Sequence, residues 1–136
     1  MPLSIYTARL GCHDPDTLNI TRMSAGPEGL PFAPSWDLLN QFKPKQKAGT
    51  LTPADWEDFK AAYIGEMRWS YRAHRAAWDV LLARPRVVLV CYEPAGEHCH
   101  RLILADLLIK AGAVYHGELP AKAEQDPRQL GLLDRK

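Results

Sequence analysis

Three consecutive residues combine a nucleophile, a proton acceptor and a cation, namely Cys99, His100 and Arg101. The apolar run 102–108 that follows them is rich in Leu and stops before Gly112, so it predicts a helix that begins near these residues. A helix N-terminus presents free N–H groups and the positive end of the macrodipole, which stabilise an anion or a thiolate. The sequence therefore indicates a candidate active site at the start of this helix.

Nucleophilic or redox chemistry at Cys99 is the first hypothesis. A thiol at a helix N-terminus, beside a histidine and an arginine, has a pKa below the free value of about 8.5, and His100 or His13 would then move protons. The alternative is that Cys99 is a small buried residue that packs the helix against a sheet. The separation of Cys91 and Arg101 is too long for the compact cysteine–loop–arginine cradle of a cysteine phosphatase, which disfavours phosphatase chemistry.

Anion binding is the second hypothesis, and it rests on Arg22 and Arg101. Arginines at strand ends that face a helix N-terminus suit bidentate binding of phosphate or carboxylate. A phosphate-bearing small molecule or a nucleic acid is therefore the predicted partner. The alternative is a salt bridge from these arginines to Glu93, Glu97 or Asp106.

A metal-dependent enzyme that uses Cys and His ligands is a further alternative, because the chain has several sulfur and imidazole groups. No C-x-x-C or H-x-x-x-H spacing is present, so the ligands would come from separate loops. Cys91 also ends an apolar run, which is typical of a core position. We therefore assign no metal ligand and leave the cofactor open, and solvated or hydrogen-bonded histidines are the competing interpretation. The possible ligands are Cys12, His13, Cys91, His98, Cys99 and His100.

A basic stripe favours a different class of function, a non-catalytic nucleic-acid-binding or regulatory module. Arg68, Arg72 and Arg75 recur at helical spacing beside Trp69 and Tyr71, and cations interleaved with aromatic rings suit a nucleic-acid backbone and its bases. The competing interpretation is a solvated helix face whose aromatic rings turn inward.

The surrounding elements must position these residues. The Val-rich run 87–91 predicts a strand buried on both faces, which is typical of a parallel sheet. Glycines and prolines predict an irregular segment over 26–34, and Pro85 ends the preceding helical pattern. Further strands are predicted over 3–8, 18–22 and 113–116. A helix is predicted over 35–42, and a basic exposed segment over 43–47 follows it. From Thr52 onward the pattern predicts either one helix or two helices broken near Gly65.

Strands that alternate with helices predict an α/β fold, a single three-layer domain over 1–119 with a small, mainly parallel sheet and flanking helices, followed by a polar C-terminal tail over 120–136. Ligands in such folds lie beyond the carboxyl ends of the strands. That edge is expected to gather Cys12, His13, Arg22 and the segment 91–101. His116 and Glu118 end the last strand and are expected at the same edge.

The composition indicates the broad class of protein but does not indicate a function. The chain has 136 residues, 46% hydrophobic and 24% charged, with a net charge of +1, as in an ordinary globular protein. Three cysteines, an odd and small number, predict free thiols in a reducing compartment. No apolar run approaches the roughly 20 residues of a membrane span, and the N-terminus lacks a signal pattern, so we expect a cytoplasmic protein with no membrane partner.

The segment 91–108 resembles a known family signature. Its C-Y-E before the loop, and its C-H-R opening a helix that contains L-A-D-L-L, are similar to the bacterial domain-of-unknown-function 488 family. The runs 5–7 and 20–22 resemble the first strand and the arginine-ended second strand of that family, so the similarity extends to about Glu118. The resemblance implies an α/β fold with Arg22, Cys99, His100 and Arg101 at the motif positions, and it implies no settled activity.

This sequence also departs from the family pattern. Members often carry an acid just before the second-strand arginine, whereas this chain has Asn19, Ile20 and Thr21 there, and His13 only loosely matches the first-loop histidine.

Overall fold

The computed structural model describes residues 2–91 and 99–119. Their core is a four-stranded sheet in the order β2-β3-β1-β4, and every paired strand is parallel. The predicted α/β class is confirmed. The predictions for Glu93, Glu97, His98 and the tail 120–136 lie outside the described residues. The strands are β1 (Ser4–Arg9), β2 (Thr17–Asn19), β3 (Arg86–Cys91) and β4 (Val114–Glu118).

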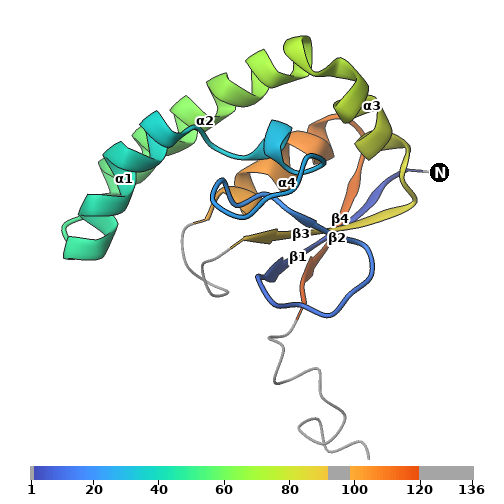
Figure 1. Cartoon of the computed structure of the whole chain (residues 1–136), viewed down its shortest axis with the longest axis horizontal. Coiled ribbons are helices and arrows are strands. Elements are labelled where there is room, and N and C mark those ends of the chain that lie inside the picture. The colour runs from blue at the N-terminus through green and yellow to red at the C-terminus, as the bar shows by residue number, and fades with distance from the viewer. Residues whose placement is uncertain (1, 92–98, 120–136) are drawn as a thin grey trace, which may run out of the picture.

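The helices gather on one side of the sheet, as Figure 1 shows. Helix α4 packs against β1, β3 and β4, and α2 packs across α4, so that the layers are the sheet, α4 and the outer helices. One hydrophobic core runs through all three layers. The helices are the 3-10 helix η1 (Leu30–Phe32), α1 (Trp36–Ala48), α2 (Pro53–Ala73), α3 (Arg75–Ala83) and α4 (His100–Lys110).

Helix α1 runs past the residue at which the sequence predicted its stop, and α2 runs through the glycine at which a break was one of two alternatives. Helix α1 continues through Pro44, because Gly49, with a φ of +73°, caps its end and lysines in its last turn favour the negative end of the macrodipole. Helix α2 continues through Gly65, since a single exposed glycine costs only about 1 kcal/mol and buried residues lie on both sides of it. The predicted basic loop 43–47 is therefore wrong. Of the two alternatives left open at Gly65, the unbroken helix is the one observed there, and the break between α2 and α3 falls at His74.

The irregular segment between β2 and α1 is held by side chains, because four successive carbonyls of 31–34 lie outside any regular ladder. Ser70 Oγ and Tyr63 OH, both on α2, donate to the first two at 2.6 Å. Arg22 Nη2 and Nε donate to the last two at 3.0 and 2.7 Å. Strand β2 ends at Asn19, so Arg22 lies in the following turn and not at the end of the predicted strand 18–22.

The second face of the sheet carries a small apolar cluster of Ala8, Val88 and Val90. The loop from β1 to β2 returns to the amino end of β3, where Arg86 Nη1 donates to Asp14 at 2.7 Å. The Arg86 guanidinium lowers the pKa of the Asp14 carboxyl.

Gly29 is required by a close approach of two backbone segments. A Cβ atom at this position would lie 1.8 Å from the carbonyl oxygen of Asn19, at the end of β2. We expect Gly29→Ala to lower the free energy of unfolding by about 2–4 kcal/mol, because backbone must move on one side or the other. Chemical denaturation measures the change.

The matched control is Gly65→Ala on α2, where a Cβ atom meets nothing within 4 Å. This variant should gain about 0.5–1 kcal/mol from helix propensity. Equal stabilities of the two variants would contradict the role assigned to Gly29.

Candidate functional site

Two cysteines meet where β3 ends and α4 begins. Cys91 is the last residue of β3, Cys99 is the N-cap of α4, and a disulfide joins them. Both residues are buried. The prediction of free thiols is therefore wrong for this pair, and among the described residues Cys12 is not part of a disulfide. The prediction rested on the number of cysteines and on short spacings between them. The end of a strand and the start of the next helix can be neighbours in space even when the two cysteines are eight residues apart in sequence.

The imidazole of His100 is fixed in one orientation. Its Nε2 lies 2.7 Å from the carbonyl oxygen of Ile20, and since a carbonyl only accepts, Nε2 carries the proton and donates. Nδ1 faces Cys99 Sγ at 3.8 Å. The ring of Tyr63 meets the imidazole edge to face, with centroids 5.5 Å apart. Burial raises the pKa of the Tyr63 hydroxyl, so this neighbour stays neutral.

Arg101 is fully buried, and its charge is matched inside the protein. Its Nη2 and Nε donate to the two carboxylate oxygens of Glu118 at 2.9 and 3.3 Å. Its Nη1 donates to Cys91 Sγ at 3.0 Å. The partner is thus Glu118 rather than Asp106, and Glu118 reaches this edge of the sheet as its position at the end of the last strand predicted.

A bulge in β4 aims Glu118 at Arg101. The pairing of β1 and β4 shifts register after Ile5, and Gly117 adopts a φ of +120°. An extra residue in a strand reverses the alternation of its side chains. Tyr115, whose OH lies 2.7 Å from Thr7 Oγ1, packs against the core on the helix side, and Glu118 reaches Arg101, which is also on that side.

Arg22 and His13 occupy different places. Arg22 is half-buried, two residues beyond the Ile20 carbonyl that holds His100, and forms no ion pair within 2–91 and 99–119. His13 is exposed, and its neighbour Asp14 binds Arg86 at the opposite end of β3 from the cysteines. The structure therefore brings Cys99, His100 and Arg101 together and leaves His13 apart, while the predicted roles of all these residues stay predictions.

The sulfur and imidazole groups converge only in part. Cys91, Cys99 and His100 place one ligand atom each within 4.8 Å of one another. Of the other ligands considered from the sequence, Cys12 packs on the second face of the sheet, and His98 lies outside the described residues.

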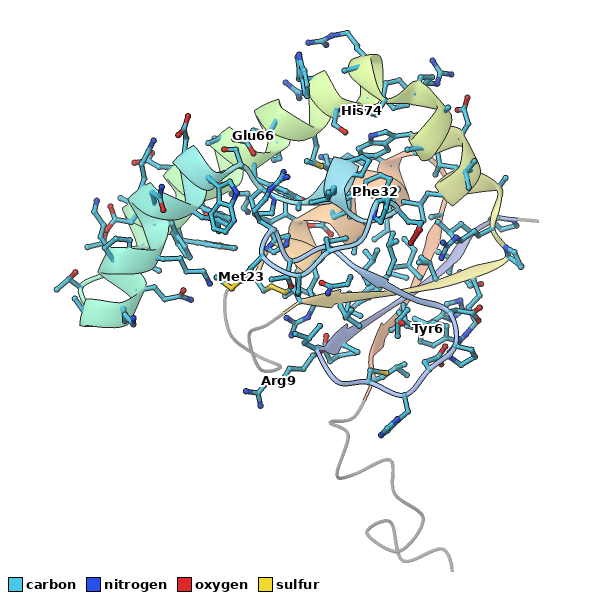
Figure 2. The ribbon with its side chains drawn as sticks, in the orientation of Figure 1. Tyr6, Arg9, Met23, Phe32, Glu66 and His74 are labelled. Carbon is cyan, nitrogen blue, oxygen red and sulfur yellow. A yellow bond between two sulfur atoms is a disulfide. The ribbon has the colours of Figure 1, made fainter. Side chains whose placement is uncertain are left out.

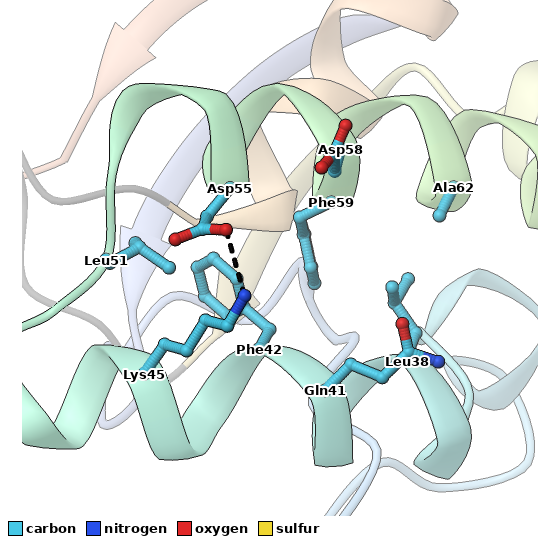
Figure 3. Close-up of a pocket in the computed structure, with 9 residues that line it drawn as sticks. All are labelled: Leu38, Gln41, Phe42, Lys45, Leu51, Asp55, Asp58, Phe59 and Ala62. Carbon is cyan, nitrogen blue, oxygen red and sulfur yellow. Dashed lines mark hydrogen bonds and ion pairs between the residues drawn. The ribbon is translucent and has the colours of Figure 1, made fainter.

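A cavity lies away from this centre, between α1 and α2 (Figure 3). It has a volume of about 120 Å³, and the ion pair of Lys45 and Asp55 crosses it at 3.0 Å. A cavity of about 10 Å³ borders Cys99 and His100. Its volume suits one water molecule. Figure 2 shows the side chains of the whole described chain.

Sequence reasoning missed two members of the site. Tyr63 was part of an apolar helix stripe, and nothing in that stripe marks it as the neighbour of His100. The Ile20 carbonyl is a backbone group, which no side-chain pattern can indicate. The only available signal was the strand-end rule, which places the residues after β2 and β3 at one edge.

A family model described as DUF488-N3a, the active DUF488-N3 subclade, matches residues 28–112. The match includes both cysteines of the disulfide together with His100 and Arg101, whereas Arg22 and Glu118 lie outside it. No curated protein and no solved structure matches the chain significantly. Within 2–91 and 99–119, none of the helices has the length and apolar character that a membrane crossing needs.

The ion pair of Arg101 and Glu118 should contribute strongly to stability. Glu118→Gln leaves the buried guanidinium without its counter-charge. We expect it to lower the free energy of unfolding by about 1.5–3 kcal/mol. The control is Asp79→Asn, which breaks an exposed ion pair with Arg75 and should change stability little. If both variants unfold at the same denaturant concentration, the pair at Arg101 is not a major constraint.

Proposed function

The chain belongs to the DUF488 family, in its active DUF488-N3 subclade, and on that premise we propose that it is an enzyme whose reactive group is the sulfur of Cys99. The observation that carries the proposal is the Cys91–Cys99 disulfide at the N-terminus of α4, with an imidazole nitrogen facing it. The proposed reaction class is thiol–disulfide exchange.

Three features support Cys99 as the attacking sulfur. As the N-cap of α4 it lies at the positive end of an eleven-residue helix, which stabilises a thiolate. His100 Nδ1, the unprotonated nitrogen, is 3.8 Å away and accepts the thiol proton. The third feature is the partner sulfur: Cys91 Sγ accepts a hydrogen bond from Arg101 Nη1, which stabilises the Cys91 thiolate when it attacks Cys99 to release the substrate.

The reaction balances with a substrate disulfide as oxidant. The Cys99 thiolate attacks one sulfur of the substrate, a mixed disulfide forms, and the first substrate thiolate leaves with the proton held by His100. Cys91 then attacks Cys99, the second substrate thiol leaves with the Cys91 proton, and the Cys91–Cys99 disulfide forms. The substrate gains two electrons and two protons, which the dithiol has lost.

The proposed substrate is anionic, of which a phosphate-bearing compound is the example drawn from the sequence. Arg22 supports this, because it is a cation without an ion pair among the described residues and lies two residues beyond Ile20, the carbonyl partner of His100. Arg101 supports it less, because Glu118 already matches its charge.

The thiol proposal predicts a reversible disulfide and an acidic Cys99. Peptide mapping after alkylation should find only Cys12 modified in the oxidised protein and all three cysteines modified after reduction. In the reduced protein, Cys99 should react with a midpoint below the free value of about 8.5, and His100→Gln should raise that midpoint. Phosphate or a nucleotide should slow the reaction in wild type, and less so in Arg22→Ala.

Cys12 supplies the internal control, because it lies on the other face of the sheet. Its midpoint should be unchanged in His100→Gln and insensitive to phosphate. Equal midpoints for Cys12 and Cys99 would contradict the proposal, as would a Cys99 that reacts only after unfolding.

A nucleic-acid-binding surface is the second candidate function, and the exposure of Trp69 favours it. Its side chain is 59% exposed on α2. Arg68 and Arg72 beside it are exposed and form no ion pair within the described part of the chain, whereas Arg75 pairs with Asp79. An exposed ring between two cations suits stacking on a base and contact with phosphates.

Binding of a single-stranded oligonucleotide tests this surface. The double variant Arg68→Ala, Arg72→Ala should flatten the dependence of log K on log salt by about 1.4, from two lost phosphate contacts. Trp69→Ala should weaken binding by about 1–3 kcal/mol. Lys110→Ala, which removes an exposed cation at the end of α4, is the control. Fluorescence anisotropy at several salt concentrations measures these changes, and equal slopes for all variants would exclude the surface.

A further inference from the structure

The three side chains at the carboxyl end of β3 form a donor set for a metal ion. The sulfur atoms of Cys91 and Cys99 and a ring nitrogen of His100 lie within 4.8 Å of one another. The residues are 0%, 2% and 7% exposed. Two thiolates and one imidazole are ligands that thiophilic ions of the zinc type prefer. A disulfide uses the two sulfurs alone, so the imidazole is an additional donor.

The orientation of His100 is the one that a metal ligand requires. Histidines that bind a metal through one nitrogen almost always donate the other N–H to a carboxylate or a backbone carbonyl. His100 Nε2 donates to the Ile20 carbonyl at 2.7 Å, which leaves the Nδ1 lone pair toward the sulfurs. Arg101 Nη1 donates a hydrogen bond to Cys91 Sγ in the same way, so that a sulfur ligand is also held by a residue that does not bind the metal.

The charges of the centre point the same way. Two thiolates at these buried positions would carry two negative charges into a region of low dielectric, which is costly without a partner. Arg101 does not offset them, because Glu118 already matches its charge. A divalent cation bound to two thiolates and a neutral imidazole gives a centre with no net charge.

We propose that, in the reduced protein, Cys91, Cys99 and His100 bind one divalent ion of the zinc class. Three protein ligands leave one position for water or substrate, as in catalytic zinc sites. The inference goes beyond the proposed thiol exchange and does not depend on it, because binding requires only the reduced ligands.

The disulfide and the metal are alternative states of the same atoms. A small-molecule disulfide that oxidises the metal-bound dithiolate forms the Cys91–Cys99 bond, releases the divalent ion, and leaves as two thiolates. Metal binding is therefore expected in the reduced state alone.

Cobalt provides the direct test, as a spectroscopic substitute for zinc. Reduced protein, purified without a histidine tag and freed of metal with a chelator, is titrated with Co²⁺. We expect thiolate-to-cobalt charge-transfer absorption that saturates at a single ion per chain and that Zn²⁺ abolishes. The same protein with its disulfide intact should give none of this absorption, a comparison that involves no mutation.

Variants assign the ligands. Cys91→Ser, Cys99→Ser and His100→Gln should each raise the Co²⁺ dissociation constant on the order of tenfold or more. Cys12→Ser, at a cysteine on the other face of the sheet, should bind as wild type does. Circular dichroism of each variant establishes that it is folded.

Two results would overturn the inference. One is a folded, reduced wild-type protein without charge-transfer absorption, and the other is equal absorption in the oxidised protein. The thiol proposal is tested separately, by alkylation of Cys99 in the presence of chelator. Reactive Cys99 without cobalt binding overturns the metal site alone, and cobalt binding with an inert Cys99 overturns the thiol proposal alone.

Discussion

A guanidinium with no exposure to solvent is the constraint on which this end of the molecule depends. Arg101 can be buried on the second residue of α4 only if a carboxylate meets it there, because an unpaired buried charge is very costly. Glu118 supplies that carboxylate from the end of β4. It does so because the bulge and the positive φ of Gly117 return its side chain to the helix side of the sheet. One ion pair consequently links the register of β4, the position of α4 on the sheet and the surroundings of the Cys91 sulfur.

The imidazole side of the centre depends on a different set of contacts, made by backbone. The Ile20 carbonyl that fixes His100 belongs to the residue directly after β2, whose N–H still donates to the Val90 carbonyl of β3. The segment that follows is anchored from two directions, by Arg22 within its own turn and by Ser70 and Tyr63 from α2. Tyr63 contacts both this segment and the imidazole ring. Helix α2 thus helps to hold the His100 ring, whose Nδ1 lies 3.8 Å from Cys99 Sγ.

Sequence patterns predicted the parts of this arrangement that are local and missed the parts that depend on tertiary contacts. The apolar strand β3, the start of α4 near Cys99 and the parallel sheet follow from composition and period, and all are confirmed. The continuation of α1 past Pro44 was missed, because caps and burial outweigh a single local breaker. The pairing of Arg101 with Glu118 was not predicted, because Glu118 lies 17 residues away and a bulge, which changes the face of a side chain, has no clear sequence signature. His13 was expected at the same edge as Cys99, yet the loop that carries it returns to the start of β3.

The burial of the centre also limits the forms that it can take. An unbalanced charge has a much higher free energy in a region of low dielectric than in water, so the stable forms of the centre are those without net charge. Four forms satisfy this condition for Cys91, Cys99 and His100. They are the disulfide, the protonated dithiol, the Cys99 thiolate paired with a protonated His100 that the thiol proposal requires, and the two thiolates with a divalent cation that the metal proposal requires. The pairing of Arg101 with Glu118 does not favour any of these over another, because the pair is itself neutral. The redox conditions and the available metal ions then determine which form is present. This is expected of a centre whose chemistry resides in its sulfur atoms.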